Sequence, residues 1–188
     1  MNTLIAVAII VIVILVIIVS IRNGLIARRN GVEMAKGSLD AMLKKRYDLI
    51  PNLIATVQQY STYEADTLSR ITQLRTKGMQ GNLTANEQAE VDTQYQALGK
   101  NFLALAENYP DLKASENYLE LQGSLNETEE QIAAVRRTYN AAINSYNNGV
   151  EQFPGSMFAS GMGMVRKEMP TITTTESQNI DVKKLFNS

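Results

Sequence analysis

The side chains that could carry chemistry here are carboxylates, lysines, tyrosines and serines, because the chain of 188 residues contains no histidine and no cysteine. Imidazole general bases, thiolate nucleophiles and zinc sites built from these two residue types are therefore excluded. The glycine-rich motifs that cradle nucleotide phosphates are also missing from the sequence. We expect no catalytic residue, no cofactor and no metal site, and hence a protein that is not an enzyme.

One carboxylate remains a candidate for an active site. Glu64 falls on an apolar helical stripe, where Arg46 or Arg137 could pair with it. A lone carboxylate or a buried ion pair is more often structural than catalytic. A further group of acids resembles a cation site, but consecutive positions of a helix do not share a face. We interpret that group as a solvated surface: Glu127, Glu129 and Glu130.

The segment from Leu4 to Ile21 is apolar throughout, with Ser20 as its only polar side chain. As a helix it would rise roughly 27 Å, close to the hydrocarbon thickness of a bilayer, about 30 Å. Only a helix satisfies the backbone of such a segment in lipid. No basic leader precedes it and no Ala-x-Ala cleavage site follows it, which argues against a secretory signal peptide. We therefore predict an uncleaved transmembrane anchor over residues 1–22, with the lipid bilayer as a partner.

Basic residues follow this segment and none precedes it. Arg22, Arg28 and Arg29 flank the membrane on that side. The positive-inside rule then predicts a single-pass protein with its N-terminus outside and the bulk of the chain in the cytoplasm. The formal net charge of −1 gives no reason to expect binding to nucleic acid.

Beyond the anchor, apolar residues recur at spacings of three and four, as in amphipathic helices. Val32, Ala35 and Leu39 lie on the first such stripe, and Arg46 interrupts it. Pro51 either kinks one long helix or lies in the first turn of a new one. The sequence leaves both alternatives open.

Later helices are marked by their ends. Thr84 and Glu87 have the spacing of a capping box, and Pro110 stops the helix that starts there. The last helix is the longest, and Asn148-Gly149 predicts its end. It carries a heptad-like seam of apolar residues: Tyr118, Leu121, Leu125, Ile132, Val135, Tyr139 and Tyr146.

Long helices joined by short loops predict an all-α fold, in which the transmembrane helix is followed by an antiparallel bundle of three to four helices. We assign residues 23–150 to this cytoplasmic bundle and residues 151–188 to a tail that is first Met/Gly-rich and then polar. Within the tail, Ser156 to Val165 is either a flap on the bundle or an adaptable apolar surface for a partner or a membrane. From Glu168 onward we expect disorder or a docking strand.

Two segments resemble the LemA family of bacterial membrane proteins. Lys44 to Leu53 (KKRYDLIPNL) is similar to the family's signature, and Glu116 to Pro154 is similar to its second hallmark. One departure is Tyr63-Glu64, where the family pattern has His-Glu, so any chemistry of that histidine is lost here. Within the signature the matching positions are Arg46, Tyr47, Asp48, Pro51 and Asn52.

The resemblance implies a helical bundle at the bacterial inner membrane with no known enzymatic activity. Two functions fit both the resemblance and the residues. In the first, the protein self-associates through its bundle into a homo-oligomeric scaffold that shapes or maintains the cell envelope. In the second, it is an adaptor whose tail contacts a membrane protease or another envelope protein.

Overall fold

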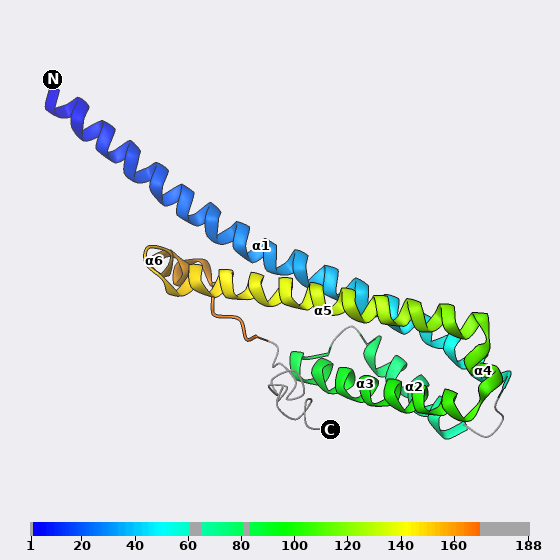
Figure 1. Ribbon diagram of the computed structural model, residues 1–188. Helices are drawn as coiled ribbons and strands as arrows, with labels where there is room; N and C mark the ends of the chain where they lie inside the picture. The colour runs from blue at the N-terminus through cyan, green and yellow to red at the C-terminus, as the bar shows by residue number, and fades with distance from the viewer. Residues whose placement is uncertain (1, 61–64, 81–82, 170–188) are drawn as a thin grey trace, which may run out of the picture. The chain divides into compact units, whose positions relative to one another are not determined.

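A computed structural model describes residues 2–60, 65–80 and 83–169 of the chain. Within these ranges every regular element is helical, which confirms the predicted all-α class (Figure 1). The elements are α1 (Asn2–Gln58), α2 (Ala65–Gly78), α3 (Ala85–Asn108), α4 (Pro110–Ala114), α5 (Glu116–Glu151), α6 (Gly155–Ala159) and the 3-10 helix η1 (Ser160–Met162).

Helix α1 is a single helix of 57 residues that runs from the apolar segment into the body of the protein. Pro51 lies inside it, so the alternative in which Pro51 lies in the first turn of a new helix is wrong. The Pro51 side chain is exposed, so its ring is not forced into the packed interior. Among the described residues α1 is the one helix apolar and long enough to cross a membrane, and none of its most apolar part is buried.

Contacts divide the chain into two compact units. We call residues 2–42 together with 131–169 the anchor unit, because it includes the apolar segment. We call the described residues between 43 and 130 the network unit. Helices α1 and α5 each contribute residues to both, so the three-part division drawn from the sequence stays a prediction.

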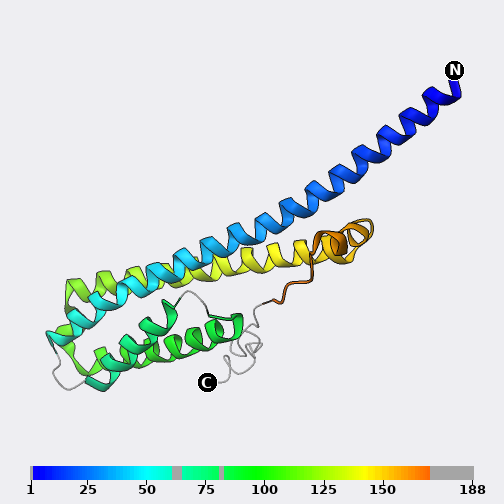
Figure 2. The same ribbon diagram turned by 180° about the vertical axis from the view of Figure 1, so that it is seen from behind.

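In the anchor unit, α1 and α5 lie side by side and antiparallel (Figures 1 and 2). Their shared core contains Leu25 and Val32 from α1 and Ile143 and Tyr146 from α5, and Ala159 and Met164 of the following segment complete it. The Arg28 guanidinium crosses between the helices and donates a hydrogen bond to the Ser145 carbonyl at 2.7 Å.

Gly149 shows why α5 continues beyond its predicted end. A Cβ atom at this position would come within 2.9 Å of Arg28 Cδ and 3.3 Å of Leu25 Cδ2. The glycine therefore provides space for a neighbouring helix rather than a left-handed cap. The helix ends at Glu151 instead, and among the described residues the one glycine with positive φ is Gly163, after η1.

In the network unit, α2 packs against α3, and α1 provides much of the buried surface. Gly78 at the end of α2 lies directly against the ring of Tyr47, where a Cβ atom would overlap the phenol. The predicted capping box at the start of α3 is confirmed. The Thr84 backbone donates to Glu87 Oε2 at 2.8 Å, and the Glu87 backbone donates to Thr84 Oγ1 at 3.3 Å.

Candidate functional site

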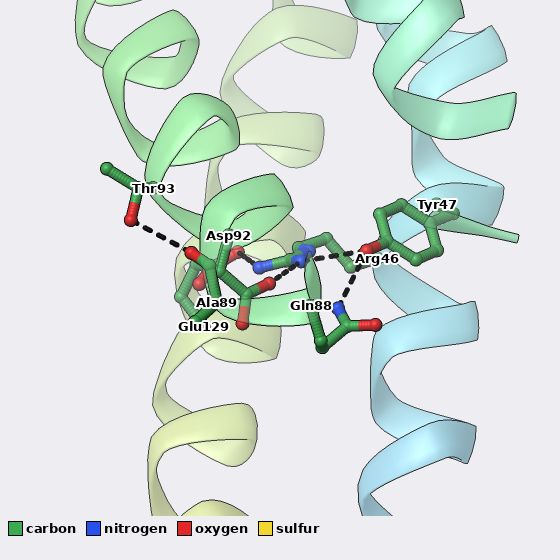
Figure 3. A network of polar contacts seen from close by, with 7 residues as sticks. All are labelled: Arg46, Tyr47, Gln88, Ala89, Asp92, Thr93 and Glu129. Carbon is green, nitrogen blue, oxygen red and sulfur yellow. Dashed lines mark hydrogen bonds and ion pairs between the residues drawn. The ribbon is translucent and has the colours of Figure 1, made fainter. Parts of the chain in front are cut away.

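Arg46 is the most deeply buried charge of the network unit, with none of its surface exposed. Its Nη2 donates to Asp92 Oδ1 at 2.5 Å, and its Nη1 lies 3.4 Å from Glu129 Oε1. Figure 3 shows the guanidinium between these two acids, one from α3 and one from α5. The guanidinium of α1 thus forms ion pairs with both α3 and α5.

Two tyrosines enclose the guanidinium on its remaining sides. Its carbon lies 4.3 Å from the ring centroid of Tyr95 and 5.1 Å from that of Tyr47. The Tyr47 hydroxyl accepts hydrogen bonds from Arg46 Nη2 at 3.2 Å and from Gln88 Nε2 at 3.3 Å. We call these residues the Arg46 network: Arg46, Tyr47, Gln88, Asp92, Tyr95 and Glu129.

Helical spacing explains how the network assembles. Gln88, Asp92 and Tyr95 follow one another at steps of four and three, which places them on one face of α3. Arg46 interrupts the apolar stripe of α1 and so faces the same interior. A guanidinium suits this position because its planar fork donates in several directions at once and stacks on aromatic rings.

The electrostatics of the network favour a fixed charge over proton transfer. Burial by itself would lower the pKa of Arg46, but the nearby Asp92 and Glu129 outweigh burial and hold this pKa above its ordinary value. Burial raises the pKa of Tyr95 to about 12, although Arg46 opposes the rise. At neutral pH Arg46 is therefore a permanent cation and Tyr95 a neutral phenol, and neither acts as a general base.

The network is suited to structural work. Its cation already faces two carboxylates, and its tyrosine hydroxyl already accepts two hydrogen bonds. Among the described residues no group of three or more acids could hold a metal ion. What the arrangement can do is fix the register of α1, α3 and α5, since a buried cation tolerates few alternative partners.

The enzyme hypothesis named Glu64 together with Arg46 or Arg137. Glu64 lies outside the described residues, and Arg137 is exposed on α5. Arg46 pairs with Asp92 and Glu129. The interpretation of Glu127, Glu129 and Glu130 as one solvated face holds in part for Glu129, whose side chain is 37% exposed and also lies 3.4 Å from the Arg46 guanidinium. Glu127 and Glu130 are exposed, in agreement with it.

The family signature divides between the interior and the surface of α1. Arg46 and Tyr47 belong to the network, whereas Asp48, Pro51 and Asn52 are exposed. Asp48 accepts from Lys44 Nζ at 2.6 Å, one turn earlier in the same helix. The signature therefore contains Arg46 and Tyr47 of the Arg46 network, whereas the residues they contact on α3 and α5 lie outside it.

The seam side chains of α5 pack against other parts of the same chain. Tyr118, Leu121, Ile132 and Tyr146 are buried. The other three seam residues are half-buried: Leu125, Val135 and Tyr139. At the membrane flank, Arg22 and Arg29 are exposed, while Arg28 donates to α5.

Two structurally important residues were missed from the sequence. The first is Asp92, which follows the buried Val91 directly and precedes Tyr95 by three residues. The second is Asn147, which is buried at 3% exposure and pairs with the backbone of Lys167. Its Nδ2 donates to the Lys167 carbonyl at 2.8 Å, and its Oδ1 accepts from the Lys167 amide at 2.9 Å.

Asn147 thereby holds part of the tail on α5. The Tyr146 hydroxyl adds a hydrogen bond to the Val165 carbonyl at 3.0 Å, and Lys167 Nζ reaches Glu33 on α1 at 2.6 Å. Ala159 and Met164 are buried in the core of the anchor unit, as a flap would be, while Met157 stays exposed, so the predicted alternative of an apolar surface for a partner or a membrane remains open. The stretch 170–188 lies outside the described residues.

Comparison with known proteins agrees with the resemblance in the sequence. A model of the LemA family matches residues 35–183. Protein LemA of Metamycoplasma hominis is 26% identical over 166 residues, which cover 88% of this chain and 76% of that protein. Magnetosome protein MamQ 2 of Paramagnetospirillum magneticum is 23% identical over 171 residues, 78% of this chain and 63% of that protein. The chain thus spans less than two thirds of this second relative.

Proposed function

Because this chain belongs to the LemA family, we propose that it is a non-enzymatic, single-pass protein of the bacterial inner membrane that self-associates into a membrane scaffold. In this proposal the N-terminus lies outside and the helical body lies in the cytoplasm. The scaffold shapes or maintains the envelope. Three of its relatives carry names of magnetosome proteins, which fits a role at a membrane but is a property of those proteins.

The observation that carries the proposal is the continuity of α1. A single helix extends from Leu4 through the apolar segment to Gln58, with no break where it would leave the membrane. Within the anchor unit, this continuity transmits the orientation of the membrane segment to the rest of α1 in that unit and to the part of α5 packed on it. Every copy in a bilayer would then present the same faces at the same height.

Such alignment lowers the cost of lateral association. Free proteins lose translational and rotational freedom when they associate, at a cost of about 4–15 kcal/mol. Confinement to one plane and one orientation removes part of that freedom in advance, so weak contacts become sufficient.

The contacts between copies have to lie outside the seam, because the seam side chains are buried or half-buried within the chain. The exposed side chains of α5 are mostly polar, and they include Glu120, Glu130 and Arg137. We therefore expect a polar interface between subunits that weakens as salt screens its charges.

The test is the size of the full-length protein in mild detergent, measured by gel filtration with light scattering and by negative-stain imaging. We expect ordered oligomers at low salt and smaller species at high salt. A monodisperse monomer at high protein concentration would contradict the scaffold.

A matched pair of variants tests the role of helix continuity. Asn23 is exposed on α1, just beyond the apolar segment. Asn23→Pro removes a helical hydrogen bond and kinks the helix there, whereas Asn23→Ala removes the same side chain and preserves the helix. We expect Asn23→Ala to assemble as the wild type does and Asn23→Pro to insert into membranes without ordered assembly.

The adaptor hypothesis predicts a different pattern. The protein would then be monomeric, and deletion of residues 170–188 would abolish its co-purification with a membrane protease while its helicity stays intact. If the same deletion leaves co-purification unchanged, the adaptor hypothesis in this form fails.

A further inference from the structure

The chain reverses direction where α5 reaches the membrane-facing end of the anchor unit. Helix α5 runs antiparallel to α1 and therefore approaches the apolar segment of α1 as it proceeds (Figure 1), and it ends at Glu151. The residues that follow turn through α6 and η1 before the chain returns along α5 to Lys167. We call the turning residues 153–162 the cap tip.

Contacts with α1 give the cap tip a defined height. A Cβ atom at Gly155 would lie 3.4 Å from Leu25 Cδ2. Phe158 and Met162 of the cap tip pack on the same hydrophobic cluster as Ile21, the last residue of the apolar segment. Leu25 is one helical turn beyond Ile21, about 6 Å along the axis. The headgroup layer on each side of a bilayer is about 5–7 Å thick, so the cap tip lies at headgroup level if α1 spans the membrane.

The cap tip presents large apolar side chains outward at this height. Phe153 is 80% exposed and Met157 is 70% exposed, while Phe158 and Ala159 beside them face inward. Gly155 holds this arrangement close to α5, because a Cβ atom there would overlap the Gly149 carbonyl oxygen. The two outward side chains are therefore placed by packing on their opposite side.

The surrounding charge is suited to an anionic lipid surface. Arg22 and Arg29 are exposed on α1 within two turns of Leu25. Each basic residue near an anionic leaflet adds to the attraction, and apolar side chains flanked by such residues are typical of segments that lie in the interface.

We propose that the cap tip is a second membrane contact, in which Phe153 and Met157 enter the boundary between headgroups and acyl chains of the leaflet that receives Ile21. This inference rests on the proposed insertion of α1 in a bilayer. The contact adds apolar volume to one leaflet only. It also prevents α1 from rotating about its own axis, so each subunit faces a defined direction in the membrane plane.

The absence of native cysteine allows a clean test with single-cysteine variants. Full-length protein with Phe153→Cys or Met157→Cys is labelled with a polarity-sensitive fluorophore and reconstituted into liposomes of phosphatidylcholine and phosphatidylglycerol. Quenchers attached to the lipids at the level of the upper acyl chain are then added. We expect blue-shifted emission at both positions and loss of that emission to the quenchers.

Two further positions make the result unambiguous. Met34→Cys is the control, because Met34 is 73% exposed on α1 but lies about 20 Å beyond Ile21 along the helix, clear of the headgroups. It should retain water-like, unquenched emission. Val11→Cys, in the middle of the apolar segment, reports insertion of α1 itself.

The outcomes separate this inference from the proposed function. Quenching at Val11 with water-like emission at Phe153 and Met157 overturns the membrane contact and leaves the anchor intact. Blue-shifted emission at the cap tip that lipid quenchers do not reduce shows that protein covers it, and also overturns the contact. If Val11 is not quenched, the proposed anchoring fails and this inference fails with it.

Discussion

The two units of the chain solve the same problem, packing α1 against α5, with different chemistry. In the anchor unit the helices approach through Gly149 and an apolar cluster around Leu25 and Val32. In the network unit Arg46 of α1 pairs with Glu129 of α5 and also with Asp92 of α3, which lies between them in the sequence. Apolar packing is tolerant of small shifts, whereas a buried cation is satisfied in few geometries. Apolar contacts therefore bring the two long helices close together in the anchor unit, while the buried charge fixes their register in the network unit.

The largest effect should come from the network. Arg46→Met removes the cation that faces Asp92 in the interior, and breaking a buried pair on one side costs about 3–5 kcal/mol. Chemical denaturation of the full-length protein, followed by circular dichroism, measures this loss. Hydrogen exchange should place the loss in the network unit rather than in the anchor unit.

A second variant sharpens this prediction. Arg46→Met combined with Asp92→Leu replaces the pair with apolar side chains and should recover much of the lost stability. The exposed Arg137→Met is the control and should change the free energy of unfolding by about 0.5 kcal/mol or less. A small effect of the single Arg46 variant would mean that the network does not hold the unit together.

Overpacking should be the largest single-site effect in the anchor unit. Gly155→Ala introduces a Cβ atom that overlaps the Gly149 carbonyl, and such overpacking costs about 1–3 kcal/mol. Gly37→Ala is its matched control, since nothing lies within 4 Å of the added atom. Because alanine favours helix over glycine by about 1 kcal/mol, the control should stabilise the protein. In thermal unfolding, the Tm should fall for Gly155→Ala and rise for Gly37→Ala. A shift in the same direction for both variants would contradict the close packing at Gly155.

A local effect should follow the loss of Asn147. Asn147→Ala removes two hydrogen bonds to Lys167, each contributing about 0.5–1.5 kcal/mol. Hydrogen exchange should accelerate at the Lys167 amide, with the core of the network unit unchanged. Asn144→Ala, at an exposed position on the same helix, is the control. Equal exchange in the two variants would show that Asn147 does not retain the tail.

The smallest effect should be the pH dependence of the Glu33–Lys167 pair. A hydrogen bond from Lys167, together with its charge, lowers the pKa of Glu33 below the ordinary 4.5. A depressed pKa stabilises the folded state above pH 4.5, and this contribution disappears as the pH falls through the lowered value. The pair is exposed, so it is worth about 1 kcal/mol at most. Glu33→Gln should reduce stability at neutral pH and converge with the wild type in acid; a constant difference would contradict the linkage.

Features that depend on neighbouring residues could be predicted from the sequence. The apolar segment, the capping box at Thr84 and the stop at Pro110 are all local, and the structure places them as expected. The end of α5 was misjudged because Asn148-Gly149 has the local chemistry of a cap, while Gly149 serves a contact with Arg28 from the far end of the chain.

Only the local part of the candidate site could be predicted, because its other residues come from distant parts of the chain. Arg46 was visible as a charge on an apolar stripe, which implies a buried acid somewhere. Its partner Asp92 is 46 residues away, and nothing in the spacing of either helix specifies how they pair. Asn147 was not singled out, because its amide binds a backbone segment twenty residues later and the sequence around it carries no sign of that contact.

The central claim is that a continuous α1 aligns identical helical bodies on a membrane so that they assemble. Cryo-electron imaging of the full-length protein in lipid vesicles tests it most directly, with Asn23→Pro reconstituted in parallel. We expect regular arrays of bodies at one height above the leaflet for the wild type and scattered bodies for the variant. Isolated, randomly oriented wild-type subunits at high density in the membrane would contradict it.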